Sequence, residues 1–298
     1  MNLVLPISVV IPTYRREQVL VDTLAYLLAL DPAPAEIIVV DQTEQHESNT
    51  DQQLQGMQEQ HRIRWLRLDA PSIPKAMNRG LIEASEPMVL FLDDDIRPEP
   101  NLIAAHHAAQ VAYPGTVVAG RVIQPWEEGM DVSPEGPFRF SGVRAAWIDE
   151  FIGANFSIER SVALALGGFD ENFVRVAYRY EAEFAHRLRR SGHRVRFEPG
   201  ACLHHLKAGG GTRTFGDYLT TWKPDHAVGA YYHALMTEVG IGRWREFLAR
   251  PVRAVATRHH LRHPWWIPLT CFAEFCGMVW ALRLARAGPR HIRPGVSQ

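Results

Sequence analysis

Three consecutive carboxylates, Asp93, Asp94 and Asp95, follow directly on the apolar run Met88–Leu92. Five apolar residues without a break are long enough for a strand buried on both faces, as in a parallel sheet covered by helices. The carboxyl end of such a strand is where open α/β sheets bind their ligands. Clustered carboxylates raise one another's pKa unless a cation lies among them, and a hard divalent ion suits oxygen ligands. A solvated acidic turn is the alternative interpretation of this triplet.

The segments that must position this triplet alternate between strand-like and helix-like patterns. Residues 7–11 are apolar and β-branched and predict a first strand, which runs into the polar loop 12–16. Residues 17–30 carry apolar side chains at helical spacing, and residues 36–41 predict a second strand that ends in Asp41. A strand, a helix and a strand in this order form a parallel pair with a right-handed crossover. Both strands therefore deliver polar groups to the same edge of the sheet.

The same alternation continues up to the acidic triplet. Residues 42–60 predict a helix and residues 63–68 a third strand. Residues 71–80 carry Pro, Ser, Asn and Gly as a binding loop would, and they lead into a short helix over residues 79–84. This order predicts a doubly wound, Rossmann-like and mostly parallel central sheet flanked by helices.

Beyond Asp95 the pattern becomes less regular. Helices are predicted over residues 101–111, 160–166 and 180–191, and strands over residues 116–122 and 194–197. Residues 199–205 bring His204 and His205 back towards the sheet, and the glycine-rich residues 209–213 predict a lid or hinge. We divide the chain into two halves that share one body, residues 1–120 and 121–222, and a helical, basic C-terminal extension over residues 223–298.

Composition excludes some classes of function. The net charge of −1 provides no global field for nucleic acid, so we expect no nucleic-acid partner. The three cysteines lack metal-ligand spacing and suit free thiols in a reducing compartment. The apolar run at residues 3–11 is too short for a signal peptide, and we expect a cytoplasmic protein.

The C-terminal extension carries a different signal. From Arg243 to the end there are ten arginines, no lysine, and two acids, Glu246 and Glu274. The apolar run at residues 264–282 is barely long enough to cross a bilayer, and Pro268 and Glu274 interrupt it. Tryptophans and arginines at its ends predict that residues 258–290 lie on the inner face of the cytoplasmic membrane. The alternatives are a helix packed on the core or in a homodimer.

Seven short blocks together resemble the inverting glycosyltransferases of family two, which have the GT-A fold. The resemblance covers residues 7–205 and rests on all the blocks occurring in family order. The blocks are SVVIPTYRR (8–16), EIIVVD (36–41), AMNRG (76–80), FLDDD (91–95), GANFSIER (153–160), GGFDENF (167–173) and PGACLHH (199–205).

The resemblance implies a role for each matching position. Asp95, Asp93 and His205 would bind Mn²⁺ or Mg²⁺, and Asp93 would also face the donor. The acceptor and sugar site would include Trp147, Gly153, Asn155 and Tyr180. The nucleotide-sugar donor would contact Pro12, Thr13, Tyr14, Arg16, Asp41, Lys75, Asn78, Asp93 and Asp94.

The sequence departs from the family pattern at two places. The family's Glu-Asp pair, whose Asp is the general base, is Tyr180-Glu181 in this chain, which implies that Glu181 is the catalytic base. Asp170 and Glu183 are the alternatives in another register. Met77 stands where the family often has Arg, and Lys75 is a candidate substitute.

These residues predict an enzyme that transfers a sugar from a nucleotide sugar, UDP-linked by expectation, to a hydroxyl. The acceptor would be a saccharide or a lipid-linked saccharide in cell-surface polysaccharide or glycolipid synthesis. A divalent ion would stabilise the leaving diphosphate, and a carboxylate would take the proton of the hydroxyl. The alternatives are a sugar nucleotidyltransferase and a non-catalytic module that binds nucleotide sugars or glycans.

Overall fold

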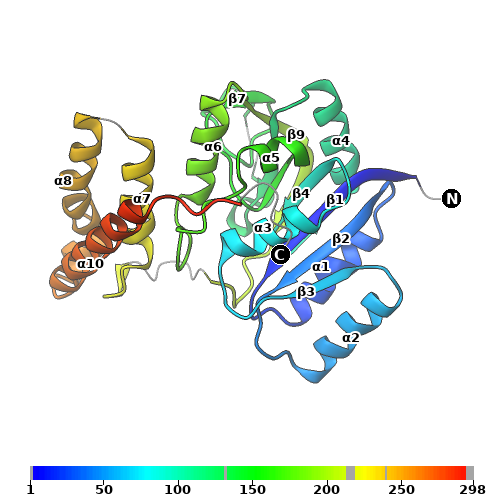
Figure 1. Ribbon diagram of the computed structural model, residues 1–298, viewed down its shortest axis with the longest axis horizontal. Helices are drawn as coiled ribbons and strands as arrows, with labels where there is room; N and C mark the ends of the chain where they lie inside the picture. The colour runs from blue at the N-terminus through cyan, green and yellow to red at the C-terminus, as the bar shows by residue number, and fades with distance from the viewer. Residues whose placement is uncertain (1–2, 131–132, 213–218, 239, 293–298) are drawn as a thin grey trace.

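Nine strands form one mixed sheet in the part of the chain that our computed structural model describes, residues 3–130, 133–212, 219–238 and 240–292 (Figure 1). Their spatial order is β3-β2-β1-β4-β8-β6-β9-β5, and β7 pairs with β9. The strands are β1 (Val4–Thr13), β2 (Ala33–Asp41), β3 (Arg64–Arg67), β4 (Met88–Leu92), β5 (Ile96–Pro98), β6 (Val117–Ile123), β7 (Ala146–Ile148), β8 (Asn155–Glu159) and β9 (Val195–His205).

The first four strands of this order are parallel, as the sequence predicts. In the register of β1 and β2, Thr13 lies opposite Asp41, so both strands end at the same edge. Strand β8 then runs antiparallel to β4, and β6 and β9 are parallel to each other. The sheet is therefore mostly parallel on one side of β4 and mixed on the other.

Two hydrophobic cores lie on the two faces of the sheet. Because successive strand residues point to opposite faces, Val10 and Phe91 lie in one core and Val9 and Leu90 in the other. The helices that cover these faces are α1 (Gln18–Leu28), α2 (Ser48–Glu59), α3 (Ile73–Glu83), α4 (Leu102–Ala112), α5 (Arg160–Ala165) and α6 (Tyr180–Arg190). Helices α1 and α4 contribute to the core that contains Val9, and α3 and α6 to the core that contains Phe91.

Helix α3 begins earlier than expected, so the predicted binding loop over residues 71–80 is wrong. The helix starts at Ile73, and Pro74 stands in its first turn. Proline fits there, because the missing backbone N–H would have no partner within the helix at that position. The proline that indicated a loop is therefore part of a helix N-terminus.

Strand β9 is also longer than expected. The sequence predicts a short strand over residues 194–197, whereas β9 continues to His205 through Pro199 and Gly200. The pairing of β6 with β9 shifts register between Gly120 and Arg121, which passes over the segment around this Pro-Gly pair. An irregularity of this kind lets a strand continue past residues that cannot complete the ladder. The continuation carries His205 to the end of the sheet that holds the acidic triplet.

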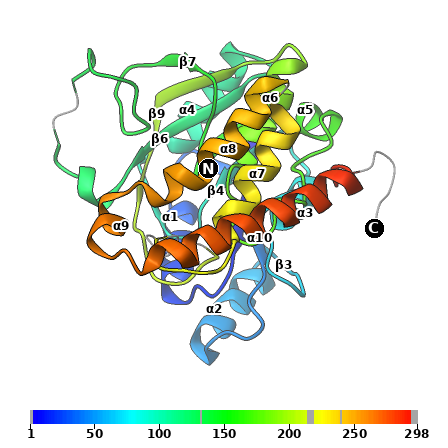
Figure 2. The same ribbon diagram turned by 90° about the vertical axis from the view of Figure 1, so that its left-hand side faces the viewer.

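In the described part of the C-terminal extension, four helices lie at one end of the molecule (Figures 1 and 2). They are α7 (Asp225–Thr237), α8 (Ile241–Val255), α9 (Arg258–Arg262) and α10 (Trp266–Ala287). Helix α10 crosses α7 closely, since a Cβ at Gly277 would lie 2.5 Å from Cβ of Ala227. The predicted helical extension is confirmed. The division of the chain at residues 120 and 222 stays a prediction.

Candidate active site

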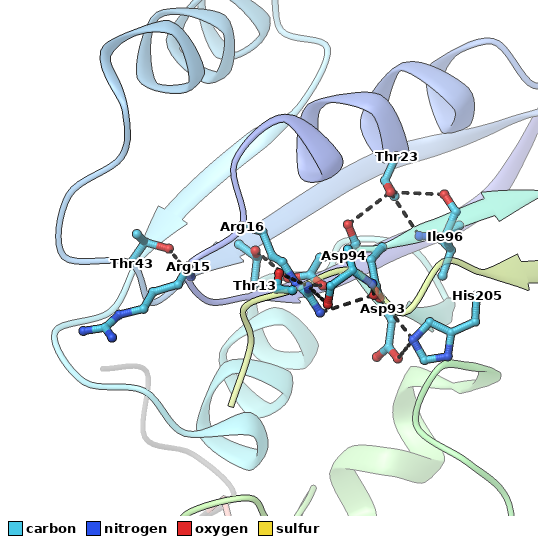
Figure 3. Close-up of polar contacts among 12 residues, drawn as sticks. Thr13, Arg15, Arg16, Thr23, Thr43, Asp93, Asp94, Ile96 and His205 are labelled. Atoms are coloured by element: carbon cyan, nitrogen blue, oxygen red, sulfur yellow. Dashed lines mark hydrogen bonds and ion pairs between the residues drawn. The ribbon is translucent and has the colours of Figure 1, made fainter. Parts of the chain in front are cut away.

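Two carboxylates and a histidine meet where β4 ends (Figure 3). Nε2 of His205 lies 3.1 Å from Oδ1 of Asp95 and 3.5 Å from Oδ2 of Asp93, and one ligand atom from each residue falls within 4.8 Å of the others. Strand pairing produces this arrangement, because β5 pairs with β9 so that Ile96 lies opposite His205. Two carboxylate oxygens and one imidazole nitrogen fit Mn²⁺, and the carboxylates also fit Mg²⁺.

Asp94, the middle residue of the triplet, points away from this cluster. It is buried, its Oδ2 accepts a 2.7 Å hydrogen bond from Oγ1 of Thr13, and its Oδ1 lies 3.2 Å from Nε of Arg16. Burial raises the pKa of Asp94 to about 7, although the charge of Arg16 and the bond from Thr13 oppose this. The structure thus brings Asp93 and Asp95 together, whereas the side chain of Asp94 contacts Thr13 and Arg16.

Asp95 is held as a charged carboxylate. Burial alone would raise its pKa, but the hydrogen bond and charge of His205 and the guanidinium of Arg16 outweigh burial and keep this pKa below its usual value. The backbone N–H of Ala208 donates to Oδ2 of Asp95 over 2.9 Å. Such a carboxylate is ready to bind a cation, since no proton has to leave first.

The predicted glycine-rich segment folds back over the first loop. Arg16 donates through Nη1 to the carbonyl oxygens of Ala208 and Gly209. Gly210 has a φ of +97°, and a Cβ there would lie 2.3 Å from the carbonyl oxygen of Arg15. Glycine is therefore needed at this close approach. The last residue of the predicted lid, Arg213, lies outside the described residues.

Tyr14 and Pro12 are half-buried beside this segment. The carbonyl oxygen of Tyr14 accepts a 3.0 Å bond from the N–H of Gly211, and the Arg15 guanidinium lies 5.0 Å from the centre of the Tyr14 ring. Contacts of Pro12 and Tyr14 with a donor nucleotide stay predictions.

Asp41 is fully buried, and its carboxylate is occupied by protein groups. It accepts hydrogen bonds from Nε1 of Trp65 (3.0 Å) and the N–H of Thr43 (2.8 Å), and Nε2 of His46 lies 2.8 Å away. Burial would raise the pKa of Asp41, but the bonds from His46 and Thr43 lower it below its usual value. Nδ1 of His46 lies 3.1 Å from Glu17, and these two carboxylates raise the pKa of His46 against the effect of burial.

The cluster of Glu17, Asp41, His46 and Trp65 was missed by the sequence analysis, except for Asp41. The spacing of His46, five residues after the end of β2, is the local signal that could have indicated it. In this structure Asp41 has no exposed surface with which to contact a nucleotide.

Asn78 and Lys75, both predicted donor contacts, differ in placement. Asn78 is buried, accepts a 2.8 Å bond from the N–H of Phe169 and donates over 2.9 Å to the carbonyl oxygen of Phe169. It therefore ties α3 to the turn that contains Phe169 and lies away from the protein surface. Lys75 is exposed on the first turn of α3, so its predicted contact with the donor remains open.

Glu181, Tyr180 and Gly153 lie together. A Cβ at Gly153 would lie 2.2 Å from the hydroxyl oxygen of Tyr180 and 3.2 Å from Oε1 of Glu181, so the absence of a side chain makes room for both groups. Glu181 is half-buried in the first turn of α6, where the helix dipole favours a carboxylate. The backbone connects this group to the metal cluster, because the N–H of Asp93 donates to the carbonyl oxygen of Ala154 over 3.3 Å.

The two alternative bases are engaged elsewhere. Asp170 is buried and accepts a 2.6 Å bond from the hydroxyl of Tyr232 and a 2.9 Å bond from the N–H of Arg290. Glu183 is buried and forms two bonds of 2.6 and 2.9 Å with Arg187. Both carboxylates hold the fold together, so neither is placed to act as the base in the other register.

Asn155 does not reach the acceptor side. Its backbone pairs with Leu92 at the end of β4, but its side chain is fully buried. Nδ2 donates to the carbonyl oxygens of Arg121 (3.1 Å) and Ala201 (2.9 Å), and Oδ1 lies 2.8 Å from Nε2 of His106. Asn155 is a buried connection between β8, β6, β9 and α4. Because its side chain is buried, the predicted contact with a sugar is not present in this structure.

Trp147 lies at the other end of the sheet. It pairs with Arg196 at the beginning of β9, nine residues before His205, which corresponds to about 30 Å along a fully extended strand. Its ring lies 3.8 Å from the guanidinium carbon of Arg194. The structure therefore does not bring Trp147 to the metal cluster.

The fold and these residues define a glycosyltransferase with the GT-A fold, and the comparison with known families agrees. Residues 8–162, more than half of the chain, match the family described as Glycosyl transferase family 2. The chain belongs to this family. No curated protein is significantly similar to it in sequence.

Several solved structures share the fold at low sequence identity. GalNAc-T7 with UDP, GalNAc and Mn²⁺ aligns with a TM-score of 0.64 at 14% identity, over 94% of this chain and 55% of that one. The mannosyltransferase PcManGT from Pyrobaculum calidifontis, in complex with GDP-Man and Mn²⁺, aligns with a TM-score of 0.53 at 18% identity over 95% and 79%. TarS 1-349 from S. aureus in complex with UDP-GlcNAc aligns with a TM-score of 0.56 at 14% identity over 95% and 92%. This chain thus spans about half the length of GalNAc-T7. At these identities, the likeness shows the fold.

Proposed function

We propose that the protein is a metal-dependent, inverting glycosyltransferase that transfers a sugar from a nucleotide sugar to an acceptor hydroxyl. The observation that carries the proposal is the position of Glu181 beside Gly153, next to Ala154, which bonds the backbone of Asp93. A carboxylate base and a metal-binding cluster thus flank the same short segment. The proposed donor is UDP-linked, which the UDP in two of the three structures described above supports.

Asp93, Asp95 and His205 would hold the ion. When bound, Mn²⁺ or Mg²⁺ supplies Lewis-acid stabilisation of the negative charge on the leaving diphosphate. Arg16 and the N–H of Ala208 keep Asp95 oriented and ionised for this purpose. Asp94 remains bound to Thr13 and Arg16, and so fixes the turn from which its two neighbours project.

Glu181 would accept the proton of the acceptor hydroxyl. As that proton moves to the carboxylate, the hydroxyl oxygen forms a bond to the anomeric carbon, and the bond from that carbon to the phosphate oxygen breaks. The electron pair leaves with the nucleoside diphosphate, and attack on the opposite face inverts the configuration through an oxocarbenium-like state. We propose a saccharide or lipid-linked saccharide as the acceptor, in cell-surface polysaccharide or glycolipid synthesis.

The test is release of nucleoside diphosphate from a panel of UDP- and GDP-sugars with Mn²⁺. We expect turnover by the wild type and a ~10²- to 10⁴-fold lower kcat for Glu181→Gln, because the amide cannot take the proton. Glu59→Gln, at an exposed position in α2, is the matched control. Binding of nucleotide sugars without turnover by the wild type would favour the non-catalytic module, and pyrophosphate release from a nucleoside triphosphate and a sugar phosphate would favour the nucleotidyltransferase.

A further inference from the structure

Helix α8 exposes a continuous apolar stripe that the sequence analysis did not single out. Four of its apolar residues are exposed, and their spacing of three or four residues places them on one side of the helix. They are Ile241, Trp244, Leu248 and Val252. Leu248 is 77% exposed, so this stripe faces away from the rest of the protein.

Helix α10 exposes a second stripe on the same end of the molecule, which Figure 2 views directly. Its exposed apolar residues follow the same spacing and are Trp265, Leu269, Phe272 and Phe275. The stripe continues into two exposed arginines, Arg283 and Arg286. We call the two stripes together the C-terminal apolar surface.

The helices behind these stripes pack through an apolar core that includes Tyr231, Phe247 and Ala281. A cavity of about 580 Å³ lies among α7, α8 and α10, and several charged residues line part of it. Two ion pairs stand there: Arg250 with Glu274 at 3.0 Å, and Arg253 with Glu246 at 2.5 Å. The exposed tryptophans, phenylalanines and leucines of the two stripes are therefore additional to the buried core, and large exposed apolar patches mark sites of interaction.

The excess of positive charge in this region indicates an anionic partner. Glu246 and Glu274 are the two acids between Arg243 and the C-terminus, and both are already paired. Exposed arginines that remain around the C-terminal apolar surface include Arg245, Arg258 and Arg262. An apolar surface edged by arginines and tryptophans matches an anionic bilayer, whose headgroups attract the cations while its interior accepts the apolar side chains.

Contacts of α10 favour a helix that lies on the membrane. Within the described residues, α10 is long and apolar enough to cross a bilayer by length and composition. However, Glu274 on α10 is buried in its pair with Arg250, Thr270 bonds His260 over 2.8 Å, and Gly277 packs against Ala227. Insertion across a bilayer would break these contacts and carry unpaired charge into the lipid.

We propose that the C-terminal apolar surface docks the protein on an anionic membrane, with α8 and α10 lying parallel to the bilayer and their exposed stripes inserted at the interface. This docking goes beyond the proposed reaction and does not depend on it. It would hold the catalytic domain at a lipid surface, where lipid-linked acceptors are presented.

The test is co-sedimentation of the full-length protein with vesicles of phosphatidylcholine containing about 30% phosphatidylglycerol, and with vesicles of phosphatidylcholine alone. We expect the wild type to bind the anionic vesicles at least tenfold more strongly, and less at high salt, since screening weakens the attraction of the arginines. Leu248→Glu and Phe272→Glu should each lower binding at least tenfold, because each replaces an inserted apolar group with a charge. Val111→Glu, which changes a 68% exposed apolar residue on α4, should bind like the wild type.

Two results would overturn this proposal. One is unchanged vesicle binding by Leu248→Glu and Phe272→Glu. The other is a stable dimer in lipid-free solution that these two changes dissociate, with no vesicle binding by the wild type, which would assign the surface to a second copy of the chain. Circular dichroism and urea unfolding of the same variants show whether they remain folded, independently of the proposed reaction.

Discussion

The sheet domain and the C-terminal helices differ in what they expose. In the sheet domain the apolar residues lie in two cores, and charged residues meet at the ends of β1, β4 and β9. The C-terminal helices pack into one of these cores through residues such as Tyr231 and Phe247, and they also expose two apolar stripes. The first arrangement suits a site for an ion and a charged, water-soluble donor. The second suits a surface that is removed from water when it binds a partner.

Paired charges occur in both regions, but they have a structural role in the C-terminal helices and a metal-binding role in the sheet domain. Arg250 and Glu274 form a largely buried ion pair of 3.0 Å that joins α8 to α10. At the strand ends, carboxylate oxygens of Asp93 and Asp95 converge on Nε2 of His205. Converging ligand atoms can bind a cation, whereas a buried ion pair holds helices together.

Asp95→Asn should have the largest effect, because it removes a charged ligand from the metal-binding cluster of the sheet domain. We expect nucleoside diphosphate release to fall at least ~10³-fold, corresponding to the loss of about 4 kcal/mol of transition-state stabilisation by the ion. Binding of Mn²⁺, followed by electron paramagnetic resonance, should weaken in parallel. Asp69→Asn, at an exposed position, is the control and should leave both measurements unchanged. Wild-type Mn²⁺ affinity in Asp95→Asn would remove the cluster from the proposed mechanism.

Glu274→Gln tests the buried ion pair of the C-terminal helices. It leaves the largely buried guanidinium of Arg250 without its partner, and we expect a destabilisation of about 3 kcal/mol. Hydrogen exchange followed by mass spectrometry should show faster exchange in α8 and α10 and unchanged protection in β1 and β4.

The neighbouring pair supplies a matched control for this prediction. Glu246→Gln removes the same charge from a pair whose arginine is mostly exposed, so we expect a loss of about 0.5 kcal/mol. Equal losses for the two variants, or faster exchange in β1 and β4 for Glu274→Gln, would contradict a separate helical unit held by its buried pair.

Strands and helices of the first half could be predicted from the sequence because each is specified locally. Residues 36–41 form a strand and residues 17–30 contain a helix, since apolar periodicity decides both. The acidic triplet was found because it follows such a strand directly. Strand β5 is different: its three residues pair with the end of β9, and a contact across more than a hundred residues leaves no local pattern.

Site residues were harder to predict, because the direction of a side chain depends on neighbouring strands. Asn155 belongs to the right sequence block, but its side chain points into the network with His106. Trp147 precedes the block that contains Gly153, yet the pairing of β7 with the start of β9 takes it to the far end of the sheet. Sequence blocks indicate which backbone segments approach the site and do not decide which side chains enter it.

The two regions should also differ, by a smaller effect, in how their contribution to stability depends on pH. The arginine pairs of the C-terminal helices keep their charge over the whole physiological range, whereas the cluster of Asp41, His46 and Glu17 depends on a proton. These carboxylates raise the pKa of His46 above the usual histidine value of about 6.5. Its stabilising effect is therefore fully present below pH 6.5 and is lost as the pH rises through the pKa of the folded state.

His46→Gln should lower the free energy of unfolding by about 1.5–3 kcal/mol at pH 5.5, the contribution of a hydrogen bond to a charged group, and by less at pH 8.5. Urea unfolding of both proteins at the two pH values measures this difference. His61→Gln, at an exposed position after α2, is the control and should change the free energy of unfolding by the same amount at both pH values. If His46→Gln lost equal stability at both, His46 would be acting as a neutral hydrogen-bonding group, and the sheet domain would then resemble the C-terminal helices in holding its buried carboxylates independently of pH.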